Sequence, residues 1–320
     1  MSHRLALPAA LVALCLFAAA STPVPAQQRL RERIAQRMEQ RTGQRDLDAG
    51  RAERATPPPG ARVERDIAYG RDPKQRYDVY VPAGVRPGAP LLVMVHGGGW
   101  RTGDKGLARV VDNKAAWWLA RGGVFVSVNN RLVPEADPLT QARDVAAAIA
   151  SVQQHARQWQ ADPAKTLLMG HSAGAHLVAL LGSDPALLRQ AGAQRPLGVV
   201  SLDSGALDVP ALMEQRRVPQ LYRDAFGSDP AYWRSVSPQQ QLARGGLPML
   251  LVCSSTRRVP TAPCDEARAF SRHAAQLGVP MQVLPQAMSH GDINGDLGLP
   301  SAYTRAVSDW IDRALMPARR

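Results

Sequence analysis

The sequence predicts an α/β fold with one doubly wound, mostly parallel sheet. Short apolar runs of the kind found in strands buried on both faces recur along the chain, and helical patterns separate most of them. Strands that alternate with helices in this way form a parallel sheet that helices cover on both faces. We find no internal repeat and no second core, so residues 62–317 are expected to fold as one domain.

The sheet is expected to begin with an antiparallel hairpin. Residues 62–69 and 76–81 are rich in strand formers, and the turn sequence Gly-Arg-Asp-Pro separates them. The elements expected after the hairpin are, in chain order, a strand at 91–95, a helix at 107–121, a strand at 124–129, a helix at 138–159, a strand at 166–169, a helix at 175–181, strands at 198–202, 249–253 and 281–284, and a helix at 301–315.

Residues 208–245 interrupt this alternation. Four prolines separate short helical pieces within the segment. A segment inserted after a strand, on the side where the strands end, would lie over a pocket. We therefore expect a small insertion that covers the functional site.

The first 26 residues have the features of a signal peptide. Arg4 supplies a positive charge, residues 5–20 form an apolar core, and residues 24–26 are small enough for a cleavage site. The apolar core is short and rich in alanine for a membrane span. We therefore expect export to the periplasm or the cell exterior, without stable membrane insertion once the signal is removed.

Residues 27–61 are expected to form a basic extension, rich in arginine and glutamine, that ends in a proline-rich linker. The formal net charge of the chain is +12, and residues 27–62 carry nine arginines against five acidic residues. The remaining charge is dispersed, without lysine runs or interleaved aromatic residues. This distribution does not favour a nucleic-acid partner.

Residues 170–174 read Gly-His-Ser-Ala-Gly, between an apolar strand and a helix rich in small residues. In this context the turn forces the middle residue, Ser172, into a strained backbone conformation and exposes its hydroxyl above the sheet. Glycines flank it because a Cβ there would collide with the neighbouring strand or helix. A plain glycine-rich turn with a surface serine is the alternative. The context favours a nucleophile, and Ser172 is predicted to be one.

A glycine run, residues 96–100 with the sequence His-Gly-Gly-Gly-Trp, follows the strand that ends at Val95. Attack by a serine on a carbonyl places negative charge on the carbonyl oxygen, and backbone N–H groups aimed at that oxygen stabilise it. Together with the turn at Ser172, the run predicts an oxyanion hole formed by the N–H groups of Gly98, Gly99 and Ala173.

The predicted general base is His290. It follows the last strand and comes after the nucleophile in chain order, as this arrangement of elements requires. The other histidines near the motifs flank the nucleophile or the glycine run, and the remaining ones lie on predicted helices. A loop histidine in the right strand order is the stronger candidate.

Two positions compete for the acid that would orient His290. The loop after strand 249–253, where this acid is commonly found, has none before Asp265 at the next helix start. Asp203 lies at the end of strand 198–202, on the same edge of the sheet as Ser172. We predict that Asp203 is the acid and keep Asp265 as the alternative, although a helix-start aspartate also has a structural explanation.

Cys253 and Cys264 are the only cysteines that remain after signal removal. They bracket one short loop, and an exported protein meets an oxidising environment. We expect a disulfide between them, with a buried free Cys253 as the alternative.

These motifs, in this order, resemble the α/β-hydrolase superfamily, in particular its hormone-sensitive-lipase-like and arylformamidase-like esterase branch. The resemblance covers residues 63–315 and includes Tyr-Asp-Val-Tyr-Val-Pro at 77–82, Asn-Arg-Leu-Val-Pro at 130–134 and Asp144. It implies the α/β-hydrolase fold, no organic cofactor and no metal. In the lipase branch the acid usually follows a later strand, and this sequence has no acid at that position. The segment Leu-Asp-Ser-Gly at 202–205 is instead similar to the segment that carries the acid in some other lipases.

The function expected from the residues and the resemblance is hydrolysis of a small carboxylic ester by an exported serine hydrolase. The acyl group would be transferred to Ser172, with His290 as general base and Asp203 as its orienting acid. An arylformamidase or amidase is the alternative within the same chemistry. A catalytically inactive hydrolase fold that serves as a binding protein is the alternative from another class.

Overall fold

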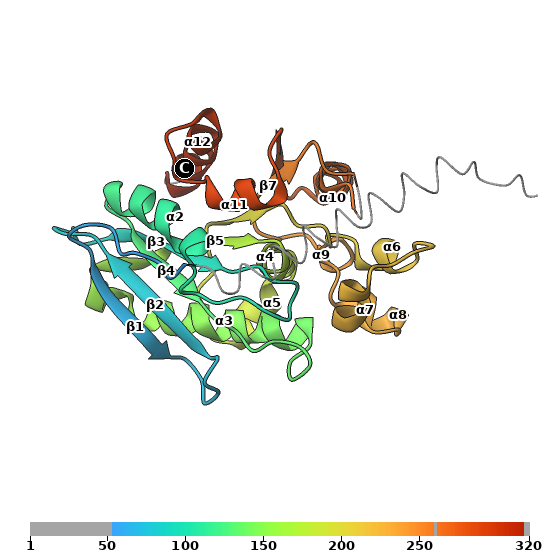
Figure 1. The fold of residues 1–320 in the computed structure, drawn as a ribbon, viewed down its shortest axis with the longest axis horizontal. Coiled ribbons are helices and arrows are strands. Elements are labelled where there is room, and N and C mark those ends of the chain that lie inside the picture. The colour runs from blue at the N-terminus through green and yellow to red at the C-terminus, as the bar shows by residue number, and fades with distance from the viewer. Residues whose placement is uncertain (1–52, 259–260, 317–320) are drawn as a thin grey trace, which may run out of the picture.

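A computed structural model describes residues 53–258 and 261–316. The predicted signal peptide and most of the basic extension lie outside the described residues. Eight strands form one sheet in the order β1-β2-β4-β3-β5-β6-β7-β8 (Figure 1). The strands are β1 (Arg62–Ala68), β2 (Arg76–Val81), β3 (Ala89–Val95), β4 (Val124–Val128), β5 (Ala161–His171), β6 (Gly198–Leu202), β7 (Met249–Ser254) and β8 (Met281–Gln286).

The sheet is antiparallel only at its first edge. β1 pairs with β2 and β2 with β4 in antiparallel register, and every later pair is parallel. The predicted hairpin and the predicted parallel sheet are both present. All parallel strands therefore end at the same edge, where β5 delivers Ser172 and β6 delivers Asp203.

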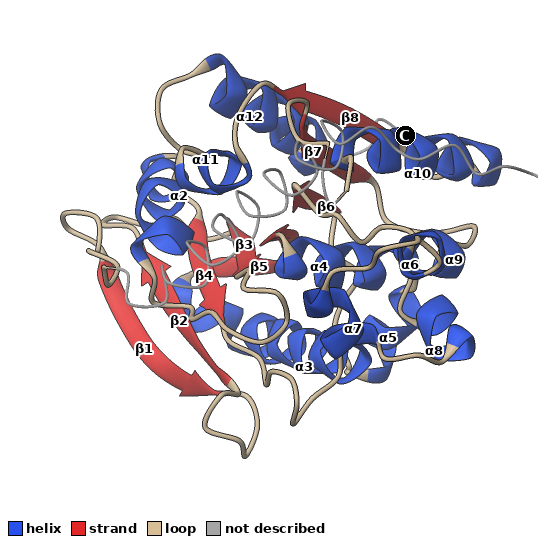
Figure 2. Ribbon diagram, turned by 45° about the vertical axis from the view of Figure 1, so that its right-hand side comes forward, coloured by secondary structure: helices blue, strands red, loops and turns tan. Residues whose placement is uncertain are grey.

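Helices cover both faces of the sheet, as Figure 2 shows. Side chains of β3 alternate between two cores, with Leu91 and Val93 in one and Leu92 and Met94 in the other, because successive residues of a strand point to opposite faces. The first core contains side chains of α3 (Pro138–His155), α4 (Ala173–Ser183), α5 (Pro185–Gln190) and α10 (Pro263–Leu277). The second contains side chains of α2 (Ala108–Ala120), α11 (His290–Gly295) and α12 (Ala302–Leu315).

The elements differ from the sequence-based expectations mainly at their ends. The helix expected to reach residue 159 ends at His155 and continues as a 3-10 turn, Ala156–Trp159, which Gln160 closes with a φ of 59°. β5 begins at Ala161, earlier than the apolar run that predicted it. Strand and helix ends depend on local hydrogen bonds, which apolar patterns do not report.

The folded body includes residues that precede β1. Backbone N–H of Ala55 donates to Gly106 O at 2.8 Å, and backbone N–H of Ala108 donates to Glu53 O at 2.9 Å. Thr56 N also donates to an Asp112 carboxylate oxygen at 3.0 Å. The part of the predicted extension that directly precedes the proline run is therefore attached to the start of α2.

The insertion at 208–245 consists of four short helices, α6 (Val209–Met213), α7 (Gln220–Phe226), α8 (Pro230–Ser235) and α9 (Pro238–Gln241). It packs against the glycine run through Trp100, whose ring lies 4.8 Å from that of Phe226 on α7. Trp100 Nε1 also donates to His176 Nδ1 on α4, and His176 Nε2 donates to Val236 O. Within the described residues, no helix has both the length and the apolar character that crossing a membrane requires.

Candidate active site

Ser172 occupies a sharp turn between β5 and α4. Its φ of 55° and ψ of −116° are strained values for a residue with a side chain. The flanking glycines make the turn possible. A Cβ on Gly170 would lie 2.3 Å from Gly174 O, and a Cβ on Gly174 would lie 2.3 Å from Val95 O. The predicted turn geometry is thus present, and the backbone packs too tightly there for any larger residue.

The glycine run lies directly beside this turn. A Cβ on Gly97 would come 3.0 Å from Ser172 Cβ. Gly98 and Gly99 have φ values of 118° and 59°, in the region that favours glycine. Ala173 is the first residue of α4, so its N–H has no acceptor within the helix. These are the residues from which the sequence predicts an oxyanion hole.

His290 is the first residue of the short helix α11, rather than part of an open loop. Ser289 caps this helix, its hydroxyl accepting from Asp292 N at 3.1 Å. His171 Nε2 donates to the backbone carbonyl of His290 at 3.0 Å, and the two rings lie 4.5 Å apart. Because His171 precedes Ser172, this contact holds His290 next to the serine.

Asp203 follows β6, and the sheet brings it to the same place. Leu202 pairs with His171 in the parallel register, and Ser172 N donates to Leu202 O at 3.0 Å. Oδ2 of Asp203 accepts from His290 Nδ1 at 2.6 Å. This bond keeps the proton on Nδ1 and leaves Nε2 of His290 as a proton acceptor.

The Asp203 carboxylate is fully buried and has several donors. Oδ1 accepts from Ser254 N at 2.7 Å, and Oδ2 accepts from Arg257 Nη2 at 3.0 Å in addition to His290. Burial raises the pKa of Asp203, but the hydrogen bond from His290 and the charge of Arg257 outweigh it and lower the pKa to about 2. Asp203 is therefore ionised at every pH at which the protein is expected to work.

Asp265, the alternative acid, lies elsewhere. It is in the first turn of α10 with its side chain 68% exposed, and it forms an ion pair with Arg268 at 2.9 Å. The carboxylate that contacts His290 belongs to Asp203 instead. The described residues show no hydrogen bond between Ser172 Oγ and His290, a contact that often tightens only when substrate binds.

Three contributors to the site were not singled out from the sequence. His171 contacts His290, Ser254 donates its N–H to Asp203, and Arg257 forms an ion pair with Asp203. Burial and the nearby charge of His290 hold the pKa of His171 well below its usual range, so its ring stays neutral. Arg257 follows β7, in the loop where an acid is usual. An arginine at that position, where an acid is usual, is the feature of the sequence that could have drawn attention to Arg257.

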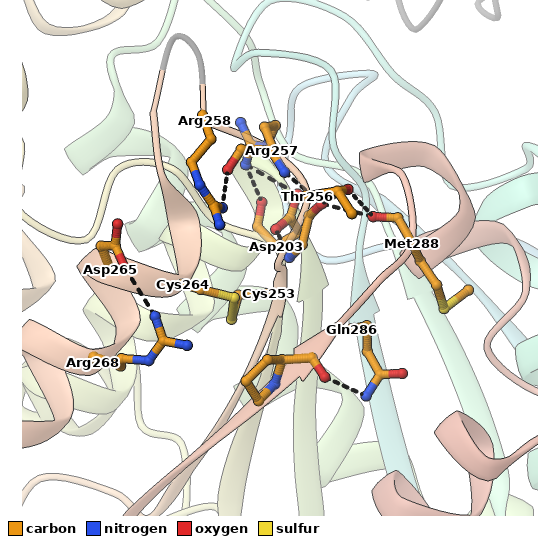
Figure 3. The surroundings of a disulfide bond; sticks show 12 residues. Asp203, Cys253, Thr256, Arg257, Arg258, Cys264, Asp265, Arg268, Gln286 and Met288 are labelled. Carbon is orange, nitrogen blue, oxygen red and sulfur yellow. Dashed lines mark hydrogen bonds and ion pairs between the residues drawn. A yellow bond between two sulfur atoms is a disulfide. The ribbon is translucent and has the colours of Figure 1, made fainter.

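Cys253 and Cys264 are joined by a disulfide beside this site. Figure 3 shows the bond between the end of β7 and the start of α10, close to Asp203. It closes the loop that carries Arg257. No cluster of three or more His, Cys, Asp or Glu side chains suited to a metal ion occurs in the part of the chain that the structure describes.

A buried lysine holds the other end of α11. Lys114 on α2 is fully buried, and its Nζ donates to Arg109 O at 2.9 Å and to Asn294 O at 2.5 Å. Burial lowers the pKa of Lys114 to about 7. Through Asn294 this side chain ties down the helix that begins with His290.

The pKa of Lys114 predicts how stability depends on pH. The unfolded chain keeps a proton on this lysine up to about pH 10, whereas the folded chain loses it near pH 7, so stability should rise between these values. In Lys114→Met this contribution disappears. Urea unfolding at several pH values should therefore give a shallower rise for Lys114→Met than for wild type. Lys165→Met, at an exposed position, is the control, and parallel curves for wild type and Lys114→Met would contradict the prediction.

Comparison with known proteins agrees with this geometry. Residues 77–191 match the BD-FAE family model. The solved structure of a truncated form of a carbohydrate esterase from gut microbiota matches with a TM-score of 0.71 at 17% identity, over 82% of this chain and 99% of that one. The chain has the α/β-hydrolase fold. The sheet order and the strand–turn–helix at Ser172 are features of this fold.

Three curated relatives match this chain over different lengths. Esterase LipC of Mycobacterium tuberculosis is 30% identical over 231 residues, which are 64% of this chain and 53% of the relative. Probable isoprenylcysteine alpha-carbonyl methylesterase ICME of Oryza sativa subsp. japonica is 27% identical over 169 residues, 51% of this chain and 40% of the relative. Kynurenine formamidase of Danio rerio is 31% identical over 116 residues, 36% of this chain and 37% of the relative. The chain thus spans about half or less of each of these relatives.

Proposed function

We propose that this chain is a serine hydrolase that cleaves small carboxylic esters through an acyl-enzyme on Ser172. The observation that carries the proposal is the 2.6 Å contact between His290 Nδ1 and Asp203 Oδ2, next to a strained serine turn. A serine, a histidine and a buried carboxylate in this relation are the parts of a catalytic triad.

In the proposed reaction, Ser172 Oγ attacks the ester carbonyl and His290 Nε2 takes its proton. The tetrahedral intermediate collapses, the C–O bond to the alcohol breaks, and His290 returns the proton to the departing alkoxide. Water, activated by His290, then releases the carboxylic acid from Ser172. Asp203 stabilises the imidazolium that forms in each half of the reaction.

In this proposal the N–H groups of Gly98, Gly99 and Ala173 stabilise the negative charge that develops on the carbonyl oxygen. Support comes from the close approach of the glycine run to Ser172 and from the free N–H at the start of α4. Hydrogen bonds aimed at this oxygen are worth several kcal/mol in related chemistry, about 3 for a single donor.

The proposed acyl group is short and uncharged. Leu221 on α7 lies against Gly99. A Cβ on Gly99 would come within 2.3 Å of Leu221 Cδ1, and the Leu221 side chain is partly exposed. An apolar wall next to the glycine run favours an alkyl or aryl acyl chain over a charged one. The relatives that are named as esterases support an ester substrate.

Two measurements test the proposal on the full chain. A panel of p-nitrophenyl esters from acetate to octanoate should be hydrolysed, with short chains preferred. A fluorophosphonate probe should label the protein, and the modified peptide should contain Ser172. A folded protein that neither hydrolyses these esters nor takes up the probe would support the inactive binding protein instead.

A formamide is the second candidate substrate, because kynurenine formamidase of Danio rerio is 31% identical over 116 residues of this chain. Formanilide and phenyl formate carry the same acyl group and differ in the leaving atom. We expect faster turnover of phenyl formate, and a reversed preference would assign the chain to amide hydrolysis.

We also propose that the protein is exported. The signal-like sequence at residues 1–26 supports this, and a disulfide is typical of oxidising compartments. Expression of the full chain followed by N-terminal sequencing should give a mature start at Gln27. An uncleaved cytoplasmic product would contradict export.

A further inference from the structure

Asp203 has a permanent cation beside it as well as the imidazole of His290. Arg257 Nη2 and His290 Nδ1 contact the same oxygen, Oδ2, at 3.0 and 2.6 Å. Figure 3 shows the Arg257 guanidinium against Asp203, on the loop that follows β7. The Asp203 side chain is fully buried and that of Arg257 is 19% exposed. The charges are therefore only weakly screened by solvent.

A role in holding the loop together does not explain how the Arg257 guanidinium is oriented. Its Nη1 donates to Thr261 Oγ1 at 3.2 Å and its backbone N–H donates to Ser254 Oγ at 3.3 Å. Yet its Nε is buried and makes no hydrogen bond within residues 53–258 and 261–316. A buried donor without a partner is costly, so the guanidinium is oriented towards Asp203 at the expense of its own hydrogen bonding.

We propose that Arg257 is a positioning residue that clamps the Asp203 carboxylate against His290 and, through its charge, extends activity to lower pH. The inference rests on the proposed function, in which His290 is the general base. A carboxylate shared with a guanidinium attracts a proton to the imidazole less strongly than a lone carboxylate does. The charge of Arg257 therefore opposes the positive charge that the imidazole gains when it takes up a proton.

Other ionisable groups surround the Asp203–His290 pair on neighbouring elements. His171 at the end of β5, Glu266 on α10 and Tyr303 on α12 interact with Asp203 directly, while Asp208 interacts with Glu266 and Lys114 with His171. Burial holds the pKa of Tyr303 well above its usual range, and this group stays neutral. Burial raises the pKa of Glu266 to about 7, so this carboxyl titrates where activity would be measured. Burial likewise lowers the pKa of Lys114 to about 7, so the titrations of Glu266 and Lys114 must both be separated from the effect of Arg257.

The test is the pH dependence of the rate at which a fluorophosphonate inactivates the full chain, because this rate reports the base of the free enzyme. In Arg257→Gln the acidic limb of the profile should move to higher pH by about one unit. Arg257→Lys keeps the positive charge. The acidic limb of its profile should therefore stay within about 0.3 pH unit of wild type, even where the inactivation rate is lower. Arg258→Gln removes a neighbouring exposed arginine whose Nη1 donates to the Arg257 carbonyl, and it should leave the acidic limb where it is in wild type.

Each outcome decides the role of Arg257. An unmoved limb in active Arg257→Gln, or an equal shift in Arg258→Gln, overturns the proposal. A shift that disappears when Glu266→Gln or Lys114→Met is added assigns the effect to that group and also overturns the proposal. If Arg257→Gln does not fold, Arg257→Lys carries the test, and a displaced limb there contradicts a role for the charge. Failure of the wild-type protein to react with the probe would contradict the proposed function instead.

Discussion

Ser172→Ala is expected to lower kcat for p-nitrophenyl butyrate by about 10⁶-fold, because the nucleophile acts as a unit with its base and cannot be bypassed. The residual rate over water would come from the oxyanion donors and from substrate binding, which the substitution leaves in place. KM should change little, since the missing hydroxyl contributes more to the transition state than to the bound ester. Steady-state kinetics, with enzyme at high concentration for the variant, measure both quantities.

The fold should survive this substitution. Alanine at φ 55° is no more strained than serine, and Ser172 makes no side-chain hydrogen bond in the described residues. The free energy of unfolding should stay within about 0.5 kcal/mol of wild type. Ser271→Ala, on α10, is the matched control and should retain full activity. A loss of less than about 100-fold in folded Ser172→Ala would show that the hydrolysis does not use this serine.

The turn at Ser172 was predictable because its causes are local. The apolar strand, the two glycines and the small residues of the following helix lie next to one another in sequence, and the backbone contacts of Gly170 and Gly174 explain why no larger residue fits. The same holds for the parallel sheet, whose strands are continuous apolar runs. The α/β-hydrolase fold follows from these patterns.

The acid was harder to choose because its role depends on contacts between distant segments. Asp203 and His290 are 87 residues apart, and only the register of β5 with β6 places Asp203 beside the serine turn. Asp265 follows the strand after which this acid is usual, but its side chain projects into solvent. His171, Arg257 and Lys114 were missed for the same reason, since their partners are backbone carbonyls or carboxylates on other elements.

Asp203→Asn is expected to lower kcat by about 10⁴-fold with little change in KM. The asparagine can either donate its amide to His290 Nδ1, which moves the imidazole proton to Nε2 and removes the base, or present its oxygen and lose the negative charge that stabilises the imidazolium. It also leaves Arg257 buried without its carboxylate partner, so the folded state should become less stable by a few kcal/mol, about 3. Ester kinetics and urea unfolding measure the two effects separately.

Asp265→Asn is the matched control, because it makes the same chemical change at the other candidate position. Its side chain is exposed and paired only with Arg268, so kcat should remain within about twofold of wild type. The pKa of Asp203, which burial raises and the contacts with His290 and Arg257 lower to about 2, keeps its carboxylate charged throughout the accessible pH range. A large loss of activity in Asp203→Asn is therefore expected at both pH 6 and pH 8. If Asp203→Asn and Asp265→Asn lowered kcat by the same factor, His290 would take its orientation from the fold rather than from Asp203.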